Sequence, residues 1–579
     1  MQTSASRRYL FSFIQHFIFS GVLLAFTYFY FGSYYEEYQG FWNALFSESL
    51  SPGTTFDNFY FLGYIGISYI YSFIQSIFPS IQWFSVFHFL QLNISFALFF
   101  SIIAYLLRKL ELKAYWLYLI FTLVFFGLFL DNIILFVYAR ASYILCAASY
   151  LAIIVFFKDM NVVKKYPFVF GILILLFLWG NLTRIESALA ASLLLFCFAV
   201  VWKSNLKNAL LISAPIMLIV GLSLILVFLD INTSTQFHKQ VEPNIETEFT
   251  VRFNVVPVSS MKTFEDSVKY EAAMRMFWAD PDIITIPYLK SLVKQEESRW
   301  FNPEQWNRVK YELQTAWNNF KFHFVFVLLL TGFSFVLLIQ NTERIKGALL
   351  VLYLLGFIIL LIENSYFVKM RDRTISPYLL IYLFSVLLLV FRYLKGNRRA
   401  FNFTIFILFV WAGINLVITK NKSELLNEVR QGNIVMLNKV KVYCSGETLM
   451  PNPTAMGNVT LAFTPFEKFD FSMFDHLYFY EASIQSIIPP YYQYLSKECN
   501  CEVRDFSNFY RYVLNPEYPN KVYTLSNEDR MIMAMVYLKI FHNLEIQYEK
   551  VKEVDLNENL AMDYFSKRKL YLYQISLAK

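Results

Sequence analysis

Apolar runs long enough to cross a lipid bilayer recur along this chain from Tyr9 to Ile418. The hydrocarbon core of a bilayer is about 30 Å thick, so a helix needs about 20 mostly apolar residues to cross it. The composition agrees, because 57% of the 579 residues are hydrophobic and only 16% are charged. A soluble chain of this length carries more charge. The sequence therefore predicts a polytopic α-helical membrane protein.

Short basic loops predict how the spans are oriented, because cytoplasmic loops carry an excess of lysine and arginine. Arg7 and Arg8 precede the first run and place the N-terminus inside. Only one of the segments 59–78 and 84–107 can then cross the membrane. We assign the span to 84–107 and interpret 59–78, which two glycines interrupt, as interfacial or re-entrant helices on the outer side. The basic loops assigned to the inside are 108–113, 158–165, 202–207, 341–346 and 392–399.

This assignment predicts eleven spans, an inside N-terminus and an outside C-terminus. The transmembrane domain is 1–418, with outer loops at 32–83 and 230–321. We expect the second of these loops to form amphipathic helices on the membrane surface. The predicted spans are 10–31, 84–107, 114–130, 133–157, 167–182, 187–202, 209–229, 322–340, 347–362, 374–391 and 401–418.

The tail, 419–579, is predicted to be a small soluble extracytoplasmic α/β domain. KVYTL indicates a strand, SNEDRMIMAMVYLKIFHN a helix, LEIQYEKV a second strand and KLYLYQISL a final strand. Ser526 is the expected N-cap of that helix, with Asp529 three residues on.

Three of the five cysteines, Cys444, Cys499 and Cys501, belong to the tail. A disulfide from Cys444 to one of the other two is one alternative if the tail is extracytoplasmic. Free thiols are the other alternative. The Cys-Asn-Cys spacing does not fit a usual zinc site.

Ionisable residues within spans point to function, since each is costly unless it is paired or faces a cavity. Arg140 lies about seven residues into the apolar segment that begins at Asp131. Arg184 and Glu186 lie at the turn between two short spans, which should be recessed below the outer surface. One interpretation makes the arginines phosphate ligands on a polar cavity floor. The other has Arg140 satisfied by backbone carbonyls or a carboxylate from another helix, and Arg184 and Glu186 in a salt bridge.

A further short outer loop is basic, against the orientation rule. It contains Glu363, Lys369, Arg371 and Arg373. It could be an ordinary solvated loop, or a basic clamp on an anionic lipid head group. Arginine suits a clamp because its planar fork binds phosphate through two hydrogen bonds.

The first outer loop supplies the opposite charge. The stretch 32–60 contains Glu36, Glu37, Glu48 and Asp57 but no lysine or arginine. An outer carboxylate facing arginines suits transfer from a phosphate-linked lipid, because the carboxylate can take the proton of an attacking hydroxyl. Asp57 is the first candidate base, and Glu36 or Glu37 the second. Asp57 is equally well placed to cap a helix.

As a whole, the chain resembles the type C integral-membrane glycosyltransferases, such as the bacterial aminoarabinose and protein mannosyl transferases. The resemblance rests on the inside N-terminus, the acidic first outer loop, about eleven spans and a soluble C-terminal domain. In that superfamily an acidic residue of the first outer loop is catalytic, and arginines near the outer face bind polyprenyl phosphate. The resemblance implies the first role for Asp57, or for Glu36 or Glu37. It implies the second for Arg140, Arg184, Arg371 and Arg373.

The implied function is transfer of a sugar from a polyprenyl-phosphate-linked donor to a glycan, lipid or protein acceptor. The implied location is the bacterial inner (plasma) membrane. The sequence indicates no cofactor and leaves a divalent cation open. The net charge of +7 needs no nucleic-acid partner, because short basic loops hold much of it.

Three other functions fit parts of the pattern. A surface-polysaccharide polymerase or ligase would also bind lipid-linked glycans with outer arginines. A transporter or flippase would place its polar residues near the middle of the membrane. A non-catalytic assembly protein would use the tail as its functional part.

Overall fold

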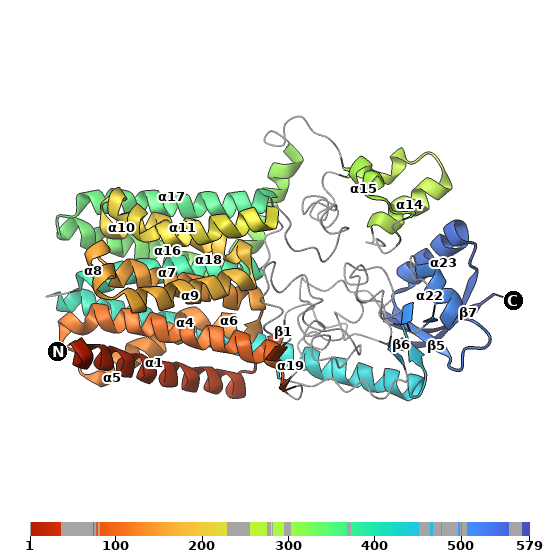
Figure 1. Ribbon diagram of the computed structural model, residues 1–579, viewed down its shortest axis with the longest axis horizontal. Coiled ribbons are helices and arrows are strands. Elements are labelled where there is room, and N and C mark those ends of the chain that lie inside the picture. Colours follow the sequence, from red (N-terminus) through yellow and green to blue (C-terminus); the bar gives the residue numbers. More distant parts are fainter. Residues whose placement is uncertain are drawn as a thin grey trace.

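The structure is a computed structural model in which a long helical bundle lies at one side and a small sheet at the other (Figure 1). The residues that it describes are 2–35, 73–74, 77–78, 81–228, 255–274, 280, 282–293, 303–367, 372–394, 397–450, 464–466, 476–477, 496–497, 499–500, 506–554 and 570–578.

Ten helices in the described part of the chain are long and apolar enough to cross a membrane. A shorter apolar helix, α9 (Pro167–Thr183), has 17 residues. These helices confirm the prediction of a polytopic helical membrane protein. The ten are α1 (Gln2–Tyr30), α4 (Trp83–Leu107), the continuous α5–η4–α6 (Ala114–Ile134), α7 (Tyr138–Phe156), α10 (Ile185–Lys203), α11 (Leu206–Phe228), α16 (Pro303–Gln340), α17 (Arg344–Phe367), α18 (Asp372–Tyr393) and α19 (Arg398–Cys444).

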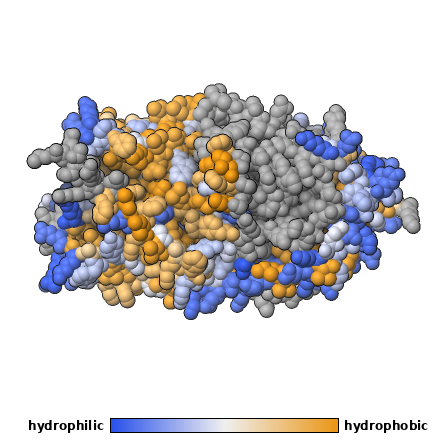
Figure 2. Space-filling view, turned by 60° about the horizontal axis from the view of Figure 1, so that its bottom comes forward, coloured by the Kyte–Doolittle hydropathy of each residue, from blue (hydrophilic) through white to orange (hydrophobic). Residues whose placement is uncertain are grey.

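The bundle is arranged around α7 and α18, which are buried along almost their whole length. Helices α4, α9 and α10 pack against α7, and α16 packs against α18. The face of the bundle that Figure 2 shows is mainly apolar, and hydrophilic residues gather toward the two ends of the molecule. Large side chains such as Phe29, Leu175 and Phe409 are exposed on this surface. Such an apolar exterior suits contact with lipid rather than with water.

The helices alternate in direction through the bundle, so the turns that follow α4, α7, α10, α16 and α18 return to the end where the N-terminus lies (Figure 1). These turns are the five loops whose basic residues predicted the orientation. The structure therefore gathers them at one end, and the opposite end faces the sheet.

Three predicted spans differ from the helices. The span predicted at 322–340 is part of a longer helix, because α16 begins at Pro303 and has a kink at Phe320. The span predicted at 133–157 is broken, because α6 ends at Ile134 and α7 begins at Tyr138. Between them, β2 (Leu135–Phe136) pairs in parallel with β1 (Tyr34–Tyr35). The span predicted at 401–418 does not end there. Helix α19 has 47 residues, about 70 Å at 1.5 Å per residue, and it runs out of the bundle to the sheet.

The C-terminal sheet has five strands in the order β4-β3-β5-β7-β6. Strand β3 is parallel to β4 and β5, and β7 is antiparallel to β5 and β6. The bounds are β3 (Thr448–Leu449), β4 (His476–Leu477), β5 (Val522–Ser526), β6 (Ile546–Val554) and β7 (Leu570–Leu577), with α22 (Phe506–Val513) and α23 (Glu528–His542). The predicted strand, helix, strand and final strand are all present.

The predicted cap was wrong by one residue, and the disulfide from Cys444, one of the two alternatives, is not formed. Ser526 is the last residue of β5, and the N-cap of α23 is Asn527, whose side chain accepts a hydrogen bond from the Arg530 amide at 2.9 Å. Asparagine and serine are similarly good N-cap residues, so residue type did not distinguish the two positions. The helix begins one residue later than predicted. Cys444 is a free, buried thiol, whereas Cys499 is disulfide-bonded.

Between 255 and 293, the described part of the loop 230–321 packs against α23, whereas 303–321 is the beginning of α16. Helix α14 (Phe264–Met274) contacts α23, and α15 (Ile286–Leu292) lies beside α14. Asp280 is fully buried, and its Oδ2 accepts hydrogen bonds from the Tyr537 hydroxyl at 2.7 Å and from His542 Nε2 at 2.5 Å. The placement of this loop on a membrane surface stays a prediction.

Asp280→Ala is expected to loosen this contact by about 2 kcal/mol, because it removes a buried acceptor that two side chains of α23 share. Backbone amides of α14 and α15 should then exchange hydrogen faster in the full-length protein. Asp282→Ala is the control, since Asp282 is exposed two residues further on. Equal exchange in the two variants would show that Asp280 does not hold the segment on α23.

Candidate functional site

The predicted site residues that the structure describes lie at the end of the bundle that faces the sheet. Helix α6 stops there because the backbone turns extended at Leu135 (φ −96°, ψ 95°). The Ser33 hydroxyl donates to the Ile133 carbonyl at 2.6 Å, which ties the end of α1 to the end of α6. One turn earlier, a π-helical stretch, η4 (Phe125–Phe129), adjoins α19. The Asn415 side chain donates to the Phe126 carbonyl at 2.7 Å. It thereby provides a hydrogen-bond partner for a carbonyl of this widened turn.

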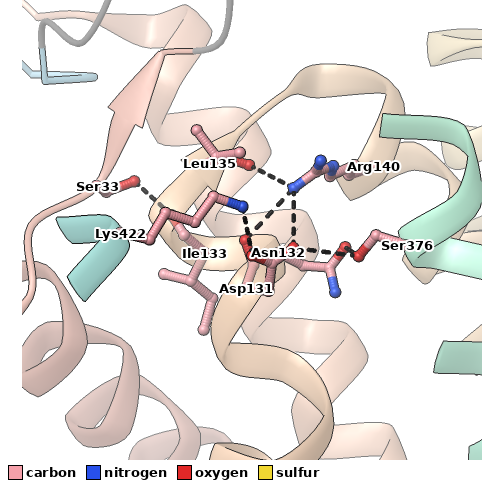
Figure 3. A network of polar contacts seen from close by, with 8 residues as sticks. All are labelled: Ser33, Asp131, Asn132, Ile133, Leu135, Arg140, Ser376 and Lys422. Atoms are coloured by element: carbon pink, nitrogen blue, oxygen red, sulfur yellow. Dashed lines mark hydrogen bonds and ion pairs between the residues drawn. The ribbon is translucent and has the colours of Figure 1, made fainter. Parts of the chain in front are cut away.

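A carboxylate of α6 contacts two cations from different helices. Asp131 Oδ1 lies 2.7 Å from Lys422 Nζ of α19, and Asp131 Oδ2 lies 3.7 Å from Arg140 Nη1 of α7. Ser376 of α18 donates to Asn132 Oδ1 at 3.1 Å and to Asp131 Oδ2 at 3.4 Å. Figure 3 shows these side chains converging from four helices. The network therefore joins α6, α7, α18 and α19 at one point.

Arg140 is completely enclosed, with 0% of its side chain exposed. Its Nη1 donates to the Leu135 carbonyl at 3.2 Å and to the Asp131 carbonyl at 3.4 Å. Because the helix breaks at 135–137, Arg140 lies in the first turn of α7 and not two turns inside a span. Carbonyls and a carboxylate therefore hold it, as one of the two interpretations expected. The contact of Arg140 with a lipid phosphate stays a prediction.

Arg184 is more open. It is the residue between α9 and α10, and 35% of its side chain is exposed. Its Nη1 donates to the Tyr138 hydroxyl at 2.5 Å, and its Nε lies 3.4 Å from Glu186 Oε2. The salt bridge with Glu186 that one interpretation expected is thus present, and the Arg184 side chain stays partly exposed.

The turn that carries Arg184 is fixed against the start of α7. At 17 residues, α9 is about 26 Å long, shorter than the hydrocarbon core of a bilayer. Gly180 lets α9 and α7 approach closely, and the Ser142 hydroxyl donates to the Gly180 carbonyl at 2.7 Å. Ser187 of α10 donates to the Ala139 carbonyl at 3.2 Å. The turn and the first turn of α7 therefore form one packed unit.

A buried polar chain lies against the same turn. His88 Nδ1 is 3.0 Å from Gln91 Oε1, and Gln91 Nε2 donates to Thr183 Oγ1 at 2.9 Å. His88 and Gln91 are fully buried in α4. In the described residues, no group of three or more His, Cys, Asp or Glu side chains could hold a metal ion.

The other predicted site residues cannot be placed beside this unit. Arg373 belongs to the first turn of α18, and its side chain lies outside the described residues. The remaining residues outside the described part of the chain are Glu36, Glu37, Asp57, Lys369 and Arg371.

No role was predicted for three residues of this site: Tyr138, Asp131 and Lys422. Asp131 was visible as a carboxylate between two apolar runs, which is itself a signal. Lys422 stands just beyond the predicted span 401–418 and was therefore included in the soluble tail. Nothing local marked Tyr138, because the chain contains 40 tyrosines.

The fold and the site together define a polytopic helical membrane protein with a polar network at one end of its bundle. No protein-family model, curated protein or solved structure matches the chain.

Proposed function

We propose that the protein is a membrane-embedded glycosyltransferase that moves a sugar from a polyprenyl-phosphate-linked donor to an acceptor at the outer face of the membrane. The observation that carries the proposal is Arg184, a partly exposed arginine at the end of a short membrane helix, braced by Tyr138 and Glu186. A guanidinium at this depth suits the phosphate of a lipid whose chains remain in the bilayer.

The orientation in this proposal has eleven spans, an inside N-terminus and an outside C-terminus. Two observations support it. The basic turns gather at the end of the bundle where the N-terminus lies, as they do in cytoplasmic loops. Cys499, on the tail, is disulfide-bonded, and disulfides are typical of oxidising compartments. The tail would then face the outside of a bacterial inner membrane.

In the proposed reaction an acceptor hydroxyl attacks the anomeric carbon of the sugar, and the bond from that carbon to the phosphate oxygen breaks. The polyprenyl phosphate leaves with the bonding electrons, and Arg184 stabilises its charge. A carboxylate of the first outer loop takes the proton of the hydroxyl. Asp57 is the first candidate for this base, and Glu36 or Glu37 the second. Lys369, Arg371 and Arg373 are proposed to hold the lipid head group.

The test uses the full chain in nanodiscs, with polyprenyl phosphate for binding and a panel of polyprenyl-phosphate sugars for transfer. Arg184→Ala should weaken polyprenyl phosphate binding by roughly tenfold or more, because it removes a charge-assisted contact. Asp57→Asn should abolish transfer and leave binding intact. Arg344→Ala is the control, since Arg344 is exposed at the other end of the bundle.

Two results would contradict the proposal. Unchanged binding of polyprenyl phosphate in Arg184→Ala would contradict the assignment of Arg184 to a phosphate site. Products that grow to polymer length would instead favour a surface-polysaccharide polymerase.

A further inference from the structure

Tyr138 contacts Arg184 in two ways at once. Its hydroxyl accepts a hydrogen bond from Arg184 Nη1 at 2.5 Å, and the guanidinium carbon lies 5.5 Å from the centre of its ring. The phenol ring therefore offers both an acceptor and a π-face to the same cation. The Glu186 carboxylate, 3.4 Å from Nε, contacts a different nitrogen of the guanidinium.

The position of Tyr138 is itself fixed. Only 6% of the residue is exposed, and its ring lies 6.3 Å from the ring of Phe84 and 6.1 Å from the ring of His88. It opens α7 directly after the extended residue Val137. The hydroxyls of Ser142 and Ser187 bind this first turn of α7 to the α9–α10 turn, as described above. The tyrosine is thus a rigid support for a side chain that is otherwise long and flexible.

A support of this kind matters for binding an anion. An unrestrained arginine loses rotamer freedom when it binds, and that loss weakens the complex. A guanidinium also has five N–H donors in a fixed fork. Because Tyr138 and Glu186 already hold the Arg184 guanidinium, it has less rotamer freedom to lose when it binds an anion.

We propose that Tyr138 is a positioning residue that holds the Arg184 guanidinium ready for the phosphate of a lipid. This inference rests on the proposed function, because it assumes that Arg184 binds that phosphate. Tyr138 acts through Arg184 and does not itself react.

Tyr138→Phe tests the inference, because it keeps the ring and removes only the hydroxyl. Binding of polyprenyl phosphate to the full chain in nanodiscs should weaken roughly three- to tenfold, the range for one hydrogen bond. The apparent Tm should stay close to that of the parent protein. Tyr143→Phe is the matched control, since Tyr143 lies on the same helix and its buried hydroxyl has no hydrogen-bond partner among the described residues. Its lipid affinity should not change.

A double-mutant cycle separates positioning from a general structural effect. In the Arg184→Ala background, Tyr138→Phe should cause no further loss of affinity. If Arg184→Ala weakens binding while Tyr138→Phe has no effect or an additive effect, the positioning role is wrong and the proposed function stands. If Arg184→Ala itself leaves the affinity unchanged, both are wrong.

Discussion

Asp131→Ala is expected to lower the free energy of unfolding by about 3–5 kcal/mol, since removing one partner of a buried ion pair leaves the remaining charge uncompensated. The carboxylate of Asp131 is shared by Arg140, which is fully enclosed, and by Lys422. The loss should appear as a lower apparent Tm in detergent micelles, followed by circular dichroism. An unchanged Tm would contradict a supporting role for this network.

Two sets of variants separate charge from packing. Lys422→Met should destabilise the protein, whereas Lys420→Met should not, because Lys420 is 61% exposed and its pair with Glu424 is at the surface. Replacing all three charges, with Asp131→Leu, Arg140→Met and Lys422→Met together, should restore most of the lost stability, as apolar replacements of buried ion pairs often do. If the triple variant is no more stable than Asp131→Ala, the effect comes from packing and not from charge.

Gly180→Val is expected to be the second strongly destabilising substitution. A Cβ at position 180 would lie 2.6 Å from Cys146 Sγ and 3.0 Å from the Ser142 carbonyl oxygen. The thiol could rotate away, but the backbone of α7 cannot, so α9 would be pushed off α7. Overpacking of this kind costs about 1–3 kcal/mol and more where the backbone must move. The same displacement would shift Arg184, four residues on, and we expect weaker binding of polyprenyl phosphate as well as a lower Tm.

Gly171→Ala is the control for this variant. Gly171 lies on the same helix and has nothing within 4 Å of an added Cβ, so alanine there should be neutral or stabilising by about 1 kcal/mol. Adding Cys146→Ala to Gly180→Val should restore part of the loss, because it removes the nearest contact. A Tm for Gly180→Val equal to that of Gly171→Ala would mean that α9 and α7 do not need the close approach.

The sequence alone was enough to predict the helices that could cross a membrane, because crossing depends on local length and hydropathy. Basic residues in short loops predicted which loops share one side of the membrane, and the fold places those loops at one end of the bundle. The segments KVYTL and KLYLYQISL, which are rich in tyrosine and aliphatic residues, predicted two strands that the sheet contains. Arg184 and Glu186 were found at a turn, and their salt bridge was among the alternatives.

Only the tertiary structure decided which charges meet. Lys422 and Asp131 are 291 residues apart in the chain, so no local pattern could pair them. The helix break at 135–137 also depended on a distant partner, since β2 exists only where it pairs with Tyr34–Tyr35 of β1. That break moves Arg140 to the start of α7 and encloses it. Hydropathy is a property of each segment, whereas the environment of a buried charge is set by whichever segments pack around it.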